Sequence, residues 1–308
     1  MGRRNKKGRD ITGIIIIDKP TGRSSNHVLQ QVKRLFDANK AGHTGSLDPL
    51  ATGVLPVCLG EATKVSSYLL DADKQYHVTC RLGTVTDSGD SDGEVVSTSD
   101  IPEFTEHDVL ALLPSFIGEL DQVPPMFSAL KHQGQPLYKL ARQGIEVERK
   151  SRRITIYDIK LLAITADSFT LDVRCSKGTY IRTLVEEISD ALGSAGHVIM
   201  LRRVAAAGYI EQQAISIEQL LASAENGISA LDELLLPAED ALSDWPSVEL
   251  SDYLVASIRQ GRAVKVEQAF ERANVRLFNP LHEFIGLAEM TDDGMVQPKR
   301  VFVVPDIQ

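Results

Sequence analysis

The sequence has few of the residues that build covalent or metal-based frameworks. Its 308 residues contain three cysteines, Cys58, Cys80 and Cys175, too far apart in sequence for a C-x-x-C redox pair or a zinc knuckle. The histidines form no His-x-x-x-His pair and no cluster with cysteine, so we expect no metal site. A chain of this length buries a hydrophobic core large enough to be stable without disulfide bonds or a structural metal. We therefore interpret each cysteine as a small buried hydrophobic residue.

Long apolar runs are also missing. The strongest early run, residues 14–17, is stopped by Asp18 and is much shorter than the roughly 20 residues that span a bilayer. No run is typical of a secretory signal. With 43% hydrophobic and 24% charged residues, the chain has the composition of a globular protein of about two domains. We expect a cytoplasmic protein without a membrane role.

Basic residues are absent from two long stretches. Residues 82–130 and residues 209–258 each hold ten acidic residues and no Lys or Arg, so the rest of the chain carries +11 although the whole chain carries -9. The densest basic patches are residues 3–9 and residues 131–153, the latter with seven basic residues. Two interpretations stand: the basic part binds a polyanion such as nucleic acid, or the charges are ordinary solvated surface.

Hydrophobic periodicity predicts mixed α and β structure. The expected strands cover residues 11–17, 54–59, 76–82, 154–164, 169–174 and 198–204. One helix is expected after a cap at Ser24 or Ser25. Further helices are expected at residues 61–70, 105–113, 137–143 and 179–192. The composition turns acidic and leucine-rich at residues 217–242, and beyond Pro246 we expect short strands at 275–278, 284–290 and 301–304.

The most unusual segment is the glycine-punctuated loop at residues 42–53. No Gly-Lys-Ser/Thr closes it, so it is not a phosphate-binding P-loop. The loop offers one carboxylate, Asp48, followed by Pro49, and its three glycines allow a close approach to a ligand. From the residues alone, an Asp-Pro pair marks a turn more often than a nucleophile. From the residues alone, Arg182 is interpreted as a surface helix charge before a partner for a buried carboxylate, and Tyr76 and Tyr180 are interpreted as core aromatics.

The same loop resembles the G-H-x-G-x-L-D-P-x-A-x-G signature of the TruB family of tRNA pseudouridine synthases. Further blocks that resemble the family follow in the expected order over nearly 200 residues. They are Asp18-Lys19-Pro20, Gly60-Glu61-Ala62-Thr63-Lys64, Tyr76 with Arg81-Leu82-Gly83, Thr86-Asp87 through Asp90, Pro124-Pro125, and Ser176-Lys177-Gly178-Thr179-Tyr180-Ile181-Arg182. Each block alone is weak, but their order makes chance agreement negligible.

The resemblance implies an α+β fold: a pseudouridine-synthase catalytic domain with a mixed, mainly antiparallel sheet flanked by helices, and a small C-terminal β-rich PUA-like domain. The composition indicates a basic disordered arm at residues 1–9 and a domain boundary near Pro246, so the resemblance implies a catalytic domain at 10–245 and a PUA-like RNA-binding domain at 246–308. A thumb-like RNA-binding insertion is expected at about residues 121–153.

The implied activity is the isomerisation of uridine 55 in the T loop of tRNA to pseudouridine. The family flips the uridine out of the loop, breaks its N-glycosidic bond and rejoins the base through carbon. The resemblance implies no cofactor and no metal, the tRNA T stem-loop as partner, and a monomer.

The resemblance also implies a role for individual residues. Asp48 is the expected nucleophile, attacking the base or the ribose carbon or stabilising a glycal-like intermediate. Arg182 is its expected ion-pair partner and is expected to lower its pKa. Tyr76 is expected to stack on the uracil and to help remove a proton. The remaining implied contacts are His43 beside the displaced nucleotides, Tyr180 and Leu201 in the uracil pocket, and Lys64, Lys131, Arg142, Lys150 and Arg152 on the RNA backbone.

Two departures and two rival functions complete the predictions. Phe127 stands where many relatives carry Tyr, and Ser88 where Thr is frequent, so one hydroxyl contact is expected to be missing. One rival is a tRNA-binding folding helper with incidental catalysis. The other is an aspartate-dependent nucleoside hydrolase, which has no use for a basic insertion.

Overall fold

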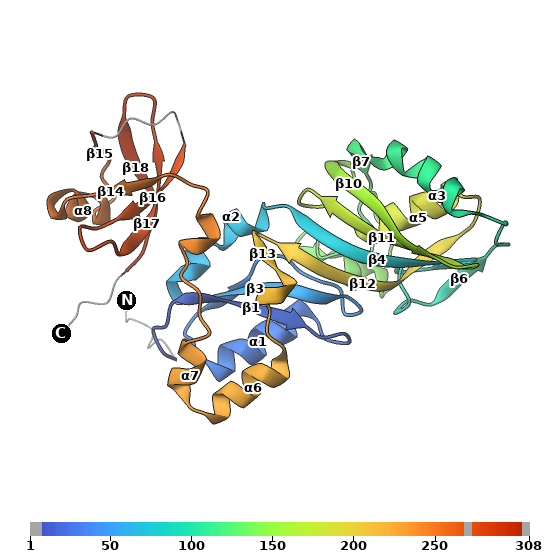
Figure 1. The fold of residues 1–308 in the computed structure, drawn as a ribbon, viewed down its shortest axis with the longest axis horizontal. Coiled ribbons are helices and arrows are strands. Elements are labelled where there is room, and N and C mark those ends of the chain that lie inside the picture. The colour runs from blue at the N-terminus through green and yellow to red at the C-terminus, as the bar shows by residue number, and fades with distance from the viewer. Residues whose placement is uncertain (1–7, 268–272, 304–308) are drawn as a thin grey trace.

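One long sheet forms the body of the molecule (Figure 1). The computed structural model describes residues 8–267 and 273–303. The sheet has nine strands in the order β1-β3-β12-β4-β11-β10-β7, with β2 paired to β3 and β13 paired to β12. Their bounds are β1 Gly13–Lys19, β2 Ala41–His43, β3 Thr52–Leu59, β4 Lys74–Leu82, β7 Gly118–Gln122, β10 Arg152–Ile164, β11 Ser168–Cys175, β12 Gly196–Ala206 and β13 Tyr209–Ile210.

The sheet is mixed and mainly antiparallel, as predicted. Only the contact between β3 and β12 is parallel, where Gly53 lies opposite Arg203. Gly53 has φ +100°, and a Cβ there would lie 2.2 Å from the backbone oxygen of Arg203, so this approach requires glycine. The loop that carries Asp48 enters β3 at this point, and it is therefore anchored beside the centre of the sheet.

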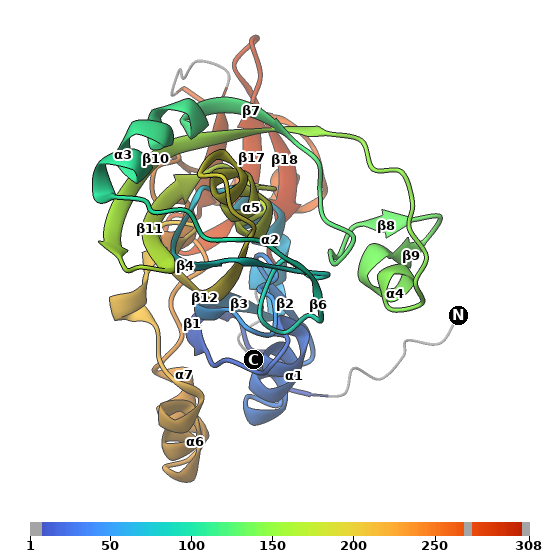
Figure 2. The same ribbon diagram turned by 90° about the vertical axis from the view of Figure 1, so that its right-hand side faces the viewer.

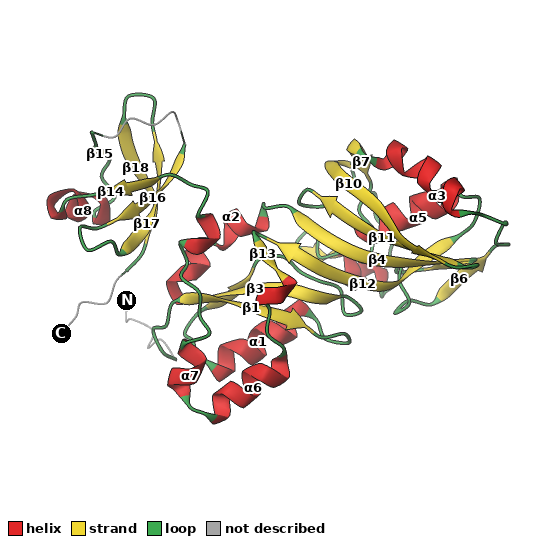
Figure 3. Cartoon of the chain, viewed as in Figure 1, coloured by secondary structure: helices red, strands yellow, loops and turns green. Residues whose placement is uncertain are grey.

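Helices cover the two halves of the sheet separately (Figures 1 and 3). Val32 of α1 and Leu220 of α6 pack on Ile17 and Leu55, whereas Val185 of α5 packs with Val78 under β4 and β11. The spacing of apolar residues in α1 and α5 places one side of each helix in the core. The helices are α1 Ser25–Leu35, α2 Ser66–Leu70, α3 Glu106–Leu112, α4 Leu137–Ala141, α5 Ile181–Ala191, α6 Ile217–Glu225, α7 Ile228–Asp232 and α8 Asp252–Arg259.

A second sheet follows near the C-terminus, with five strands in the order β14-β16-β17-β18-β15. These strands are β14 Ser247–Glu249, β15 Val264–Lys265, β16 Asn274–Phe278, β17 Phe284–Met290 and β18 Met295–Val301. Phe284 and Phe302 share one apolar cluster with Ile14 and Val54 of the long sheet. The two sheets are therefore packed against each other through buried side chains.

Two small hairpins extend from the long sheet. One pairs β5 Thr84–Thr86 with β6 Val95–Thr98, and the other pairs β8 Lys131–His132 with β9 Gln135–Pro136. Figure 2 shows β8, β9 and α4 projecting from the sheet as a separate finger. This finger belongs to the basic segment 131–153.

Most predicted elements are confirmed, and two are wrong. The helix expected at residues 61–70 is instead a 3₁₀ helix at Gly60–Lys64 followed by α2. The strand expected at residues 301–304 is β18, which starts earlier and contains Pro298 at a shift in strand register. Because β18 contains a proline and charged residues, its sequence lacks the apolar alternation that predicts a strand. Val304 lies outside the described residues.

The disordered arm predicted at residues 1–9 is wrong at Arg9, while residues 1–7 lie outside the described part. Arg9 pairs with Asp232 at 2.5 Å and shares backbone hydrogen bonds with Asp37 and Asn39. Across the described residues, no helix is long and apolar enough to cross a membrane. The three cysteines are fully buried, as predicted, and burial raises the pKa of each thiol to about 12.

Candidate active site

The loop that carries Asp48 is held from the N-terminal side by residues 19–25. The Ser25 hydroxyl accepts a hydrogen bond from the Leu47 N–H at 2.7 Å and lies 3.1 Å from the Leu47 carbonyl oxygen, to which it donates. The Lys19 ammonium is fully buried and donates to the carbonyl oxygens of Pro20, Arg23 and Pro49. These bonds fix the backbone on both sides of Asp48.

Arg203 holds the same loop from β12. Its side chain is buried and donates to the carbonyl oxygens of Val54 at 2.7 Å and Gly45 at 3.1 Å. The sequence predicts that the loop glycines allow a ligand to come close. In the structure, Gly53 instead allows the β12 backbone to come close, and Gly45, at φ +131°, lies against the Arg203 guanidinium. At these two positions, glycine serves the packing of the loop on Arg203.

Arg182 lies beside Asp48, as predicted, and it is not a surface charge. Its side chain is 4% exposed, and its Nε lies 3.0 Å from Oδ2 of Asp48. The rest of the guanidinium is also engaged: Nη1 contacts Asp90 at 3.5 Å and the Ser88 carbonyl oxygen, and Nη2 donates to the Phe127 carbonyl oxygen at 2.7 Å. The planar group is thus fixed on three sides, and Nε is directed at Asp48.

Asp90 is a second carboxylate on the same guanidinium. It is 4% exposed and accepts a hydrogen bond from the Ser88 hydroxyl at 2.6 Å, whereas Asp48 is 38% exposed. Ser88 therefore keeps a hydroxyl contact, and Phe127 contributes only its backbone to Arg182. Of the two carboxylates that share Arg182, only Asp48 is open to a substrate.

The pKa of Asp48 reflects two opposing effects. Arg182 lowers this pKa, as expected, but the loss of hydration on burial is the larger effect, and Asp90 acts in the same direction as burial. The net result is a pKa above the ordinary value of an aspartate. The cation is thus needed to keep Asp48 ionised in a site that otherwise favours its protonated form.

Apolar and aromatic side chains form the floor beneath the loop. Tyr76 of β4 is 8% exposed, and it joins Leu201 of β12 and Leu47 of the loop in one cluster. The pairing of β4 with β12 places Tyr76 opposite Arg203 and Val78 opposite Leu201. Burial raises the pKa of the Tyr76 phenol, whereas the neighbouring Arg203 lowers it. The predicted Tyr76 and Leu201 are therefore together, under Asp48.

Tyr180 and His43 lie at two edges of this site. The side-chain amide of Gln122 bonds both the N–H and the carbonyl oxygen of Tyr180, which fixes the start of α5. Burial raises the pKa of Tyr180, the nearby Arg152 and Arg182 oppose this rise, and the Asp48 charge adds a smaller increase. The imidazole of His43 accepts a hydrogen bond from the Gly45 N–H at 3.4 Å, and burial lowers its pKa. His43 is thus a neutral side chain at the first turn of the Asp48 loop.

The predicted RNA-backbone residues fall into two groups. Among the described residues, no carboxylate pairs with the exposed Lys131, Arg142, Lys150 and Arg152, whereas Arg149 and Arg153 of the same segment have acidic partners. Lys64 is different, because its ammonium pairs with Glu61 and donates to the Val301 carbonyl oxygen. Lys64 therefore joins the long sheet to the C-terminal sheet.

Sequence reasoning assigned no role to three buried charged residues of the site, Lys19, Asp90 and Arg203. Burial lowers the pKa of Lys19 to about 8. Lys19 and Asp90 lie inside segments that resemble the family, so the resemblance could have indicated that they belong to the site. Arg203 stands beside Leu201 but is separated in sequence from the loop that it holds. Across the described residues, no group of three or more His, Cys, Asp and Glu is placed to hold a metal ion.

Comparison with known proteins identifies the family. Residues 33–181 match the model of the TruB family pseudouridylate synthase N-terminal domain, residues 182–243 the tRNA pseudouridylate synthase B C-terminal domain, and residues 246–302 the C-terminal domain of pseudouridine synthase II TruB. The chain is 52% identical to a tRNA pseudouridine synthase B of Nitrosococcus oceani, over 97% of both chains. It is 53% identical to one of Saccharophagus degradans, over 98% of this chain and 99% of that one.

Solved structures show the same fold. A chain of a Cbf5-Nop10-Gar1 complex superposes with a TM-score of 0.74 at 27% identity, over 96% of this chain and 86% of that chain. A chain of an H/ACA RNP bound to a substrate RNA containing 2'-deoxyuridine gives the same TM-score at 25% identity, over 99% and 92%. The α+β fold with a PUA-like C-terminal part is thus confirmed, and this chain belongs to the TruB family of pseudouridylate synthases.

Proposed function

We propose that this protein isomerises uridine 55 in the T loop of tRNA to pseudouridine. The observation that carries the proposal is the Asp48 carboxylate, held 3.0 Å from Arg182 and open to solvent above an apolar and aromatic floor. Its relatives are named tRNA pseudouridine synthase B, and a structural neighbour was solved with a substrate RNA.

The uridine reaches Asp48 by leaving the T loop. Extrusion of a nucleotide costs a few kcal/mol, and stacking on an aromatic ring returns about 1–3 kcal/mol per base. We assign this stacking to Tyr76, with Leu201 and Tyr180 lining the pocket around the uracil. His43, at the start of the loop, faces the displaced nucleotides.

Asp48 is the nucleophile of the proposed reaction. It attacks the base or the ribose carbon, or stabilises a glycal-like intermediate. The N-glycosidic bond breaks, the base turns, and a carbon–carbon bond forms between base and ribose. The proton of that base carbon leaves, and the freed ring nitrogen gains one, so the product is an isomer of the substrate. We assign Tyr76 to the removal of this proton, with Arg203 opposing the rise in pKa that burial causes.

The remaining parts bind the RNA. We assign residues 10–245 to a catalytic domain, 246–308 to a PUA-like RNA-binding domain and 121–153 to a thumb-like insertion. The exposed Lys131, Arg142, Lys150 and Arg152 of this insertion contact phosphates, because no carboxylate of the described residues neutralises them. A tRNA substrate places the enzyme in the cytoplasm.

The test is pseudouridine mapping on an unmodified tRNA transcript, incubated with the purified protein without added metal or nucleotide. We expect one new pseudouridine, in the T loop, and none with Asp48→Asn. Asp48→Asn is expected to keep its tRNA affinity, because Asp48 contributes a reacting group and no phosphate contact. Loss of both activity and affinity in this variant would show that Asp48 is structural.

Two further assays on the same purified protein, of tRNA binding and of nucleoside hydrolysis, separate the rival functions. Tight, salt-sensitive binding without modification points to the tRNA-binding folding helper. Release of a free base from a nucleoside, with no requirement for tRNA, points to the hydrolase. Either result contradicts the proposed isomerase activity.

A further inference from the structure

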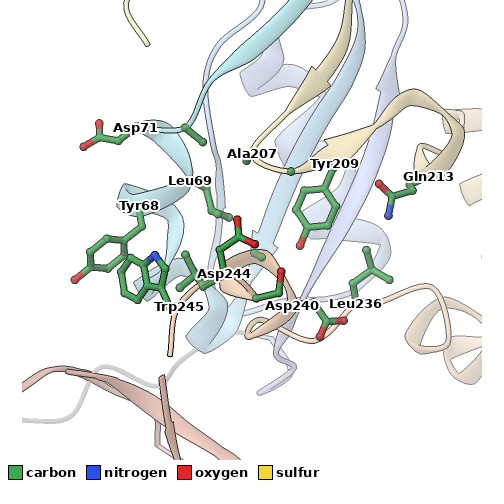
Figure 4. Close-up of a pocket in the computed structure, with 15 residues that line it drawn as sticks. Tyr68, Leu69, Asp71, Ala207, Tyr209, Gln213, Leu236, Asp240, Asp244 and Trp245 are labelled. Carbon is green, nitrogen blue, oxygen red and sulfur yellow. The ribbon is translucent and has the colours of Figure 1, made fainter. Parts of the chain in front are cut away.

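A cavity of about 520 Å³ lies outside the Asp48 site (Figure 4). It is bounded by α2, by the turn after β12, and by residues 236–245, which lead into the second sheet. None of its lining residues belongs to the site around Asp48. Its volume falls within the range of pockets that hold small organic molecules.

Carboxylates give this cavity a negative charge. Asp240 and Asp244 line it, and no basic side chain of the described residues lies within ion-pair distance of either one. Asp71 also lines it, but Asp71 pairs with Lys177 at 3.0 Å and its carboxylate points away from the cavity in Figure 4. The nearby Arg276 donates to backbone carbonyl oxygens of Ser243 and Trp245. The cavity therefore repels phosphates and attracts cations.

Aromatic rings line one side of the cavity. Tyr68 and Trp245 meet edge to face, with ring centroids 4.9 Å apart and an interplanar angle of 84°. Figure 4 shows this pair on one side, Tyr209 on the other, and Asp244 between them. Aromatic faces attract ammonium groups and also pack well against an aliphatic stem.

Tyr209 provides an independent indication of a ligand. Its side chain is only 5% exposed, yet its hydroxyl has no hydrogen-bond partner in the protein. Buried polar groups are nearly always bonded, so an unpartnered hydroxyl in a cavity wall marks a position for a polar ligand atom. Burial, then the neighbouring Cys58 and last Asp240 raise the pKa of this phenol, so it stays neutral and its oxygen accepts a hydrogen bond from a donor.

We propose that this cavity binds an aliphatic amine with two or more ammonium groups, such as a linear polyamine. One ammonium group bonds the Tyr209 oxygen, Asp240 and Asp244 neutralise the charge, and the carbon chain lies against Tyr68 and Trp245. Because the lining comes both from the long sheet and from the segment that leads into the second sheet, the bound amine links the two parts.

The experiment uses the fluorescence of Trp245, which is the only tryptophan of the chain. Spermidine or putrescine is titrated into the full-length protein without tRNA, with sodium chloride of equal ionic strength as the control. We expect a saturable change with the amines and none with the salt. Asp240→Asn and Asp244→Asn should each weaken the affinity about threefold to tenfold, since each removes one charge-assisted contact. Asp292→Asn, an exposed carboxylate of the second sheet, should change nothing.

Tyr209→Phe gives a second measurement that is safe against misfolding. Removing an unpartnered buried hydroxyl leaves the melting temperature of the amine-free protein unchanged or raises it. The same variant should lose affinity for the amines about threefold to tenfold. A titration without saturation, or one that these three variants leave unchanged, would overturn the proposal. Because no RNA is present, this result does not depend on the proposed tRNA activity.

Discussion

At the scale of a single residue, a substitution of Arg182 tests the geometry of the site most directly. A lysine at this position supplies one cation but not the four directed contacts to Asp48, the Ser88 and Phe127 carbonyl oxygens, and Asp90. We expect Arg182→Lys to lower kcat at least about a hundredfold, which corresponds to about 2.7 kcal/mol of transition-state stabilisation. Single-turnover kinetics with saturating tRNA measure this loss.

The same variant should also be less stable. Asp90 is as buried as Arg182, and complete loss of the cation beside a buried carboxylate costs about 3–5 kcal/mol, so a lysine that keeps the charge but loses the directed contacts should cost part of this. Urea unfolding measures the loss, and tRNA affinity should change little. Arg174→Lys is the matched control, because Arg174 is exposed on the face of Tyr157. Wild-type turnover in Arg182→Lys would refute the assigned role of the pair.

Glu186, next to this network, links stability to pH. Burial raises the pKa of its carboxyl to about 7, against a smaller opposing effect of Arg182. A raised carboxyl pKa means that the folded state favours the protonated form. This stabilisation is complete below the ordinary pKa and is lost as the pH rises through about 7.

Glu186→Gln should therefore be more stable than wild type at alkaline pH and equal to it in acid. The expected gain is about 2–3 kcal/mol in the free energy of unfolding near pH 8. Urea unfolding across the pH range measures it, with the exposed Glu225→Gln as a control that should follow wild type. A constant difference at every pH would mean that packing, and not ionisation, sets the effect.

Individual residues of the site were predictable to different degrees. Asp48 and Arg182 are far apart in sequence, and only the family resemblance connected them. No periodicity indicates that Asp90 shares Arg182 or that Arg203 holds the Asp48 loop, because such contacts depend on the order of strands in the sheet. The lowering of the Asp48 pKa by Arg182 was predictable, but the larger opposing effect of lost hydration was not, since the loss of hydration is a property of the folded site.

At the scale of elements, the sequence predicts well where local patterns decide. Ser24 caps α1, Thr105 forms a capping box at α3, and residues 154–164 pair with the next strand, as expected. The errors lie where tertiary contacts override the pattern. The helical periodicity of residues 61–70 is broken by a 3₁₀ turn, and β18 is held by its neighbours despite Pro298.

The basic segment 131–153 allows a comparison of two variants that lose the same kind of charge. Replacing Arg142, Lys150 and Arg152 by glutamine should weaken tRNA binding and flatten its dependence on salt. Removing a cation that neutralises one phosphate reduces the steepness of log K against log salt by about 0.7–0.9. Binding isotherms at several salt concentrations measure the slope.

The control for this variant lies in the same segment. Arg149 and Arg153 already pair with Glu146, Glu119 and Asp121, so replacing these two arginines by glutamine should leave the slope nearly unchanged. An unchanged slope in the first variant would remove the segment from the RNA interface. An equal effect of both sets would show that total charge, and not the exposed cations, governs binding.

At the scale of the whole molecule, the two sheets are coupled by a shared apolar cluster. Phe302 is 6% exposed and meets Phe284 edge to face at 4.9 Å, and Lys64 bonds the adjacent Val301 carbonyl oxygen. The cluster continues to Ile14 of β1 and Val54 of β3 in the long sheet. Because this contact is buried and apolar, we expect the protein to unfold in one transition.

Phe302→Ala should separate the two parts. Loss of a buried phenylalanine costs about 3–5 kcal/mol, and here the loss falls on the contact between the sheets. We expect the single transition to split, with fluorescence of Trp245, at the start of the second sheet, changing before the far-ultraviolet circular dichroism of the long sheet. The exposed Val303→Ala should behave as wild type. A variant that is less stable but still unfolds in one step, with both signals coincident, would mean that the sheets are coupled by contacts other than Phe302.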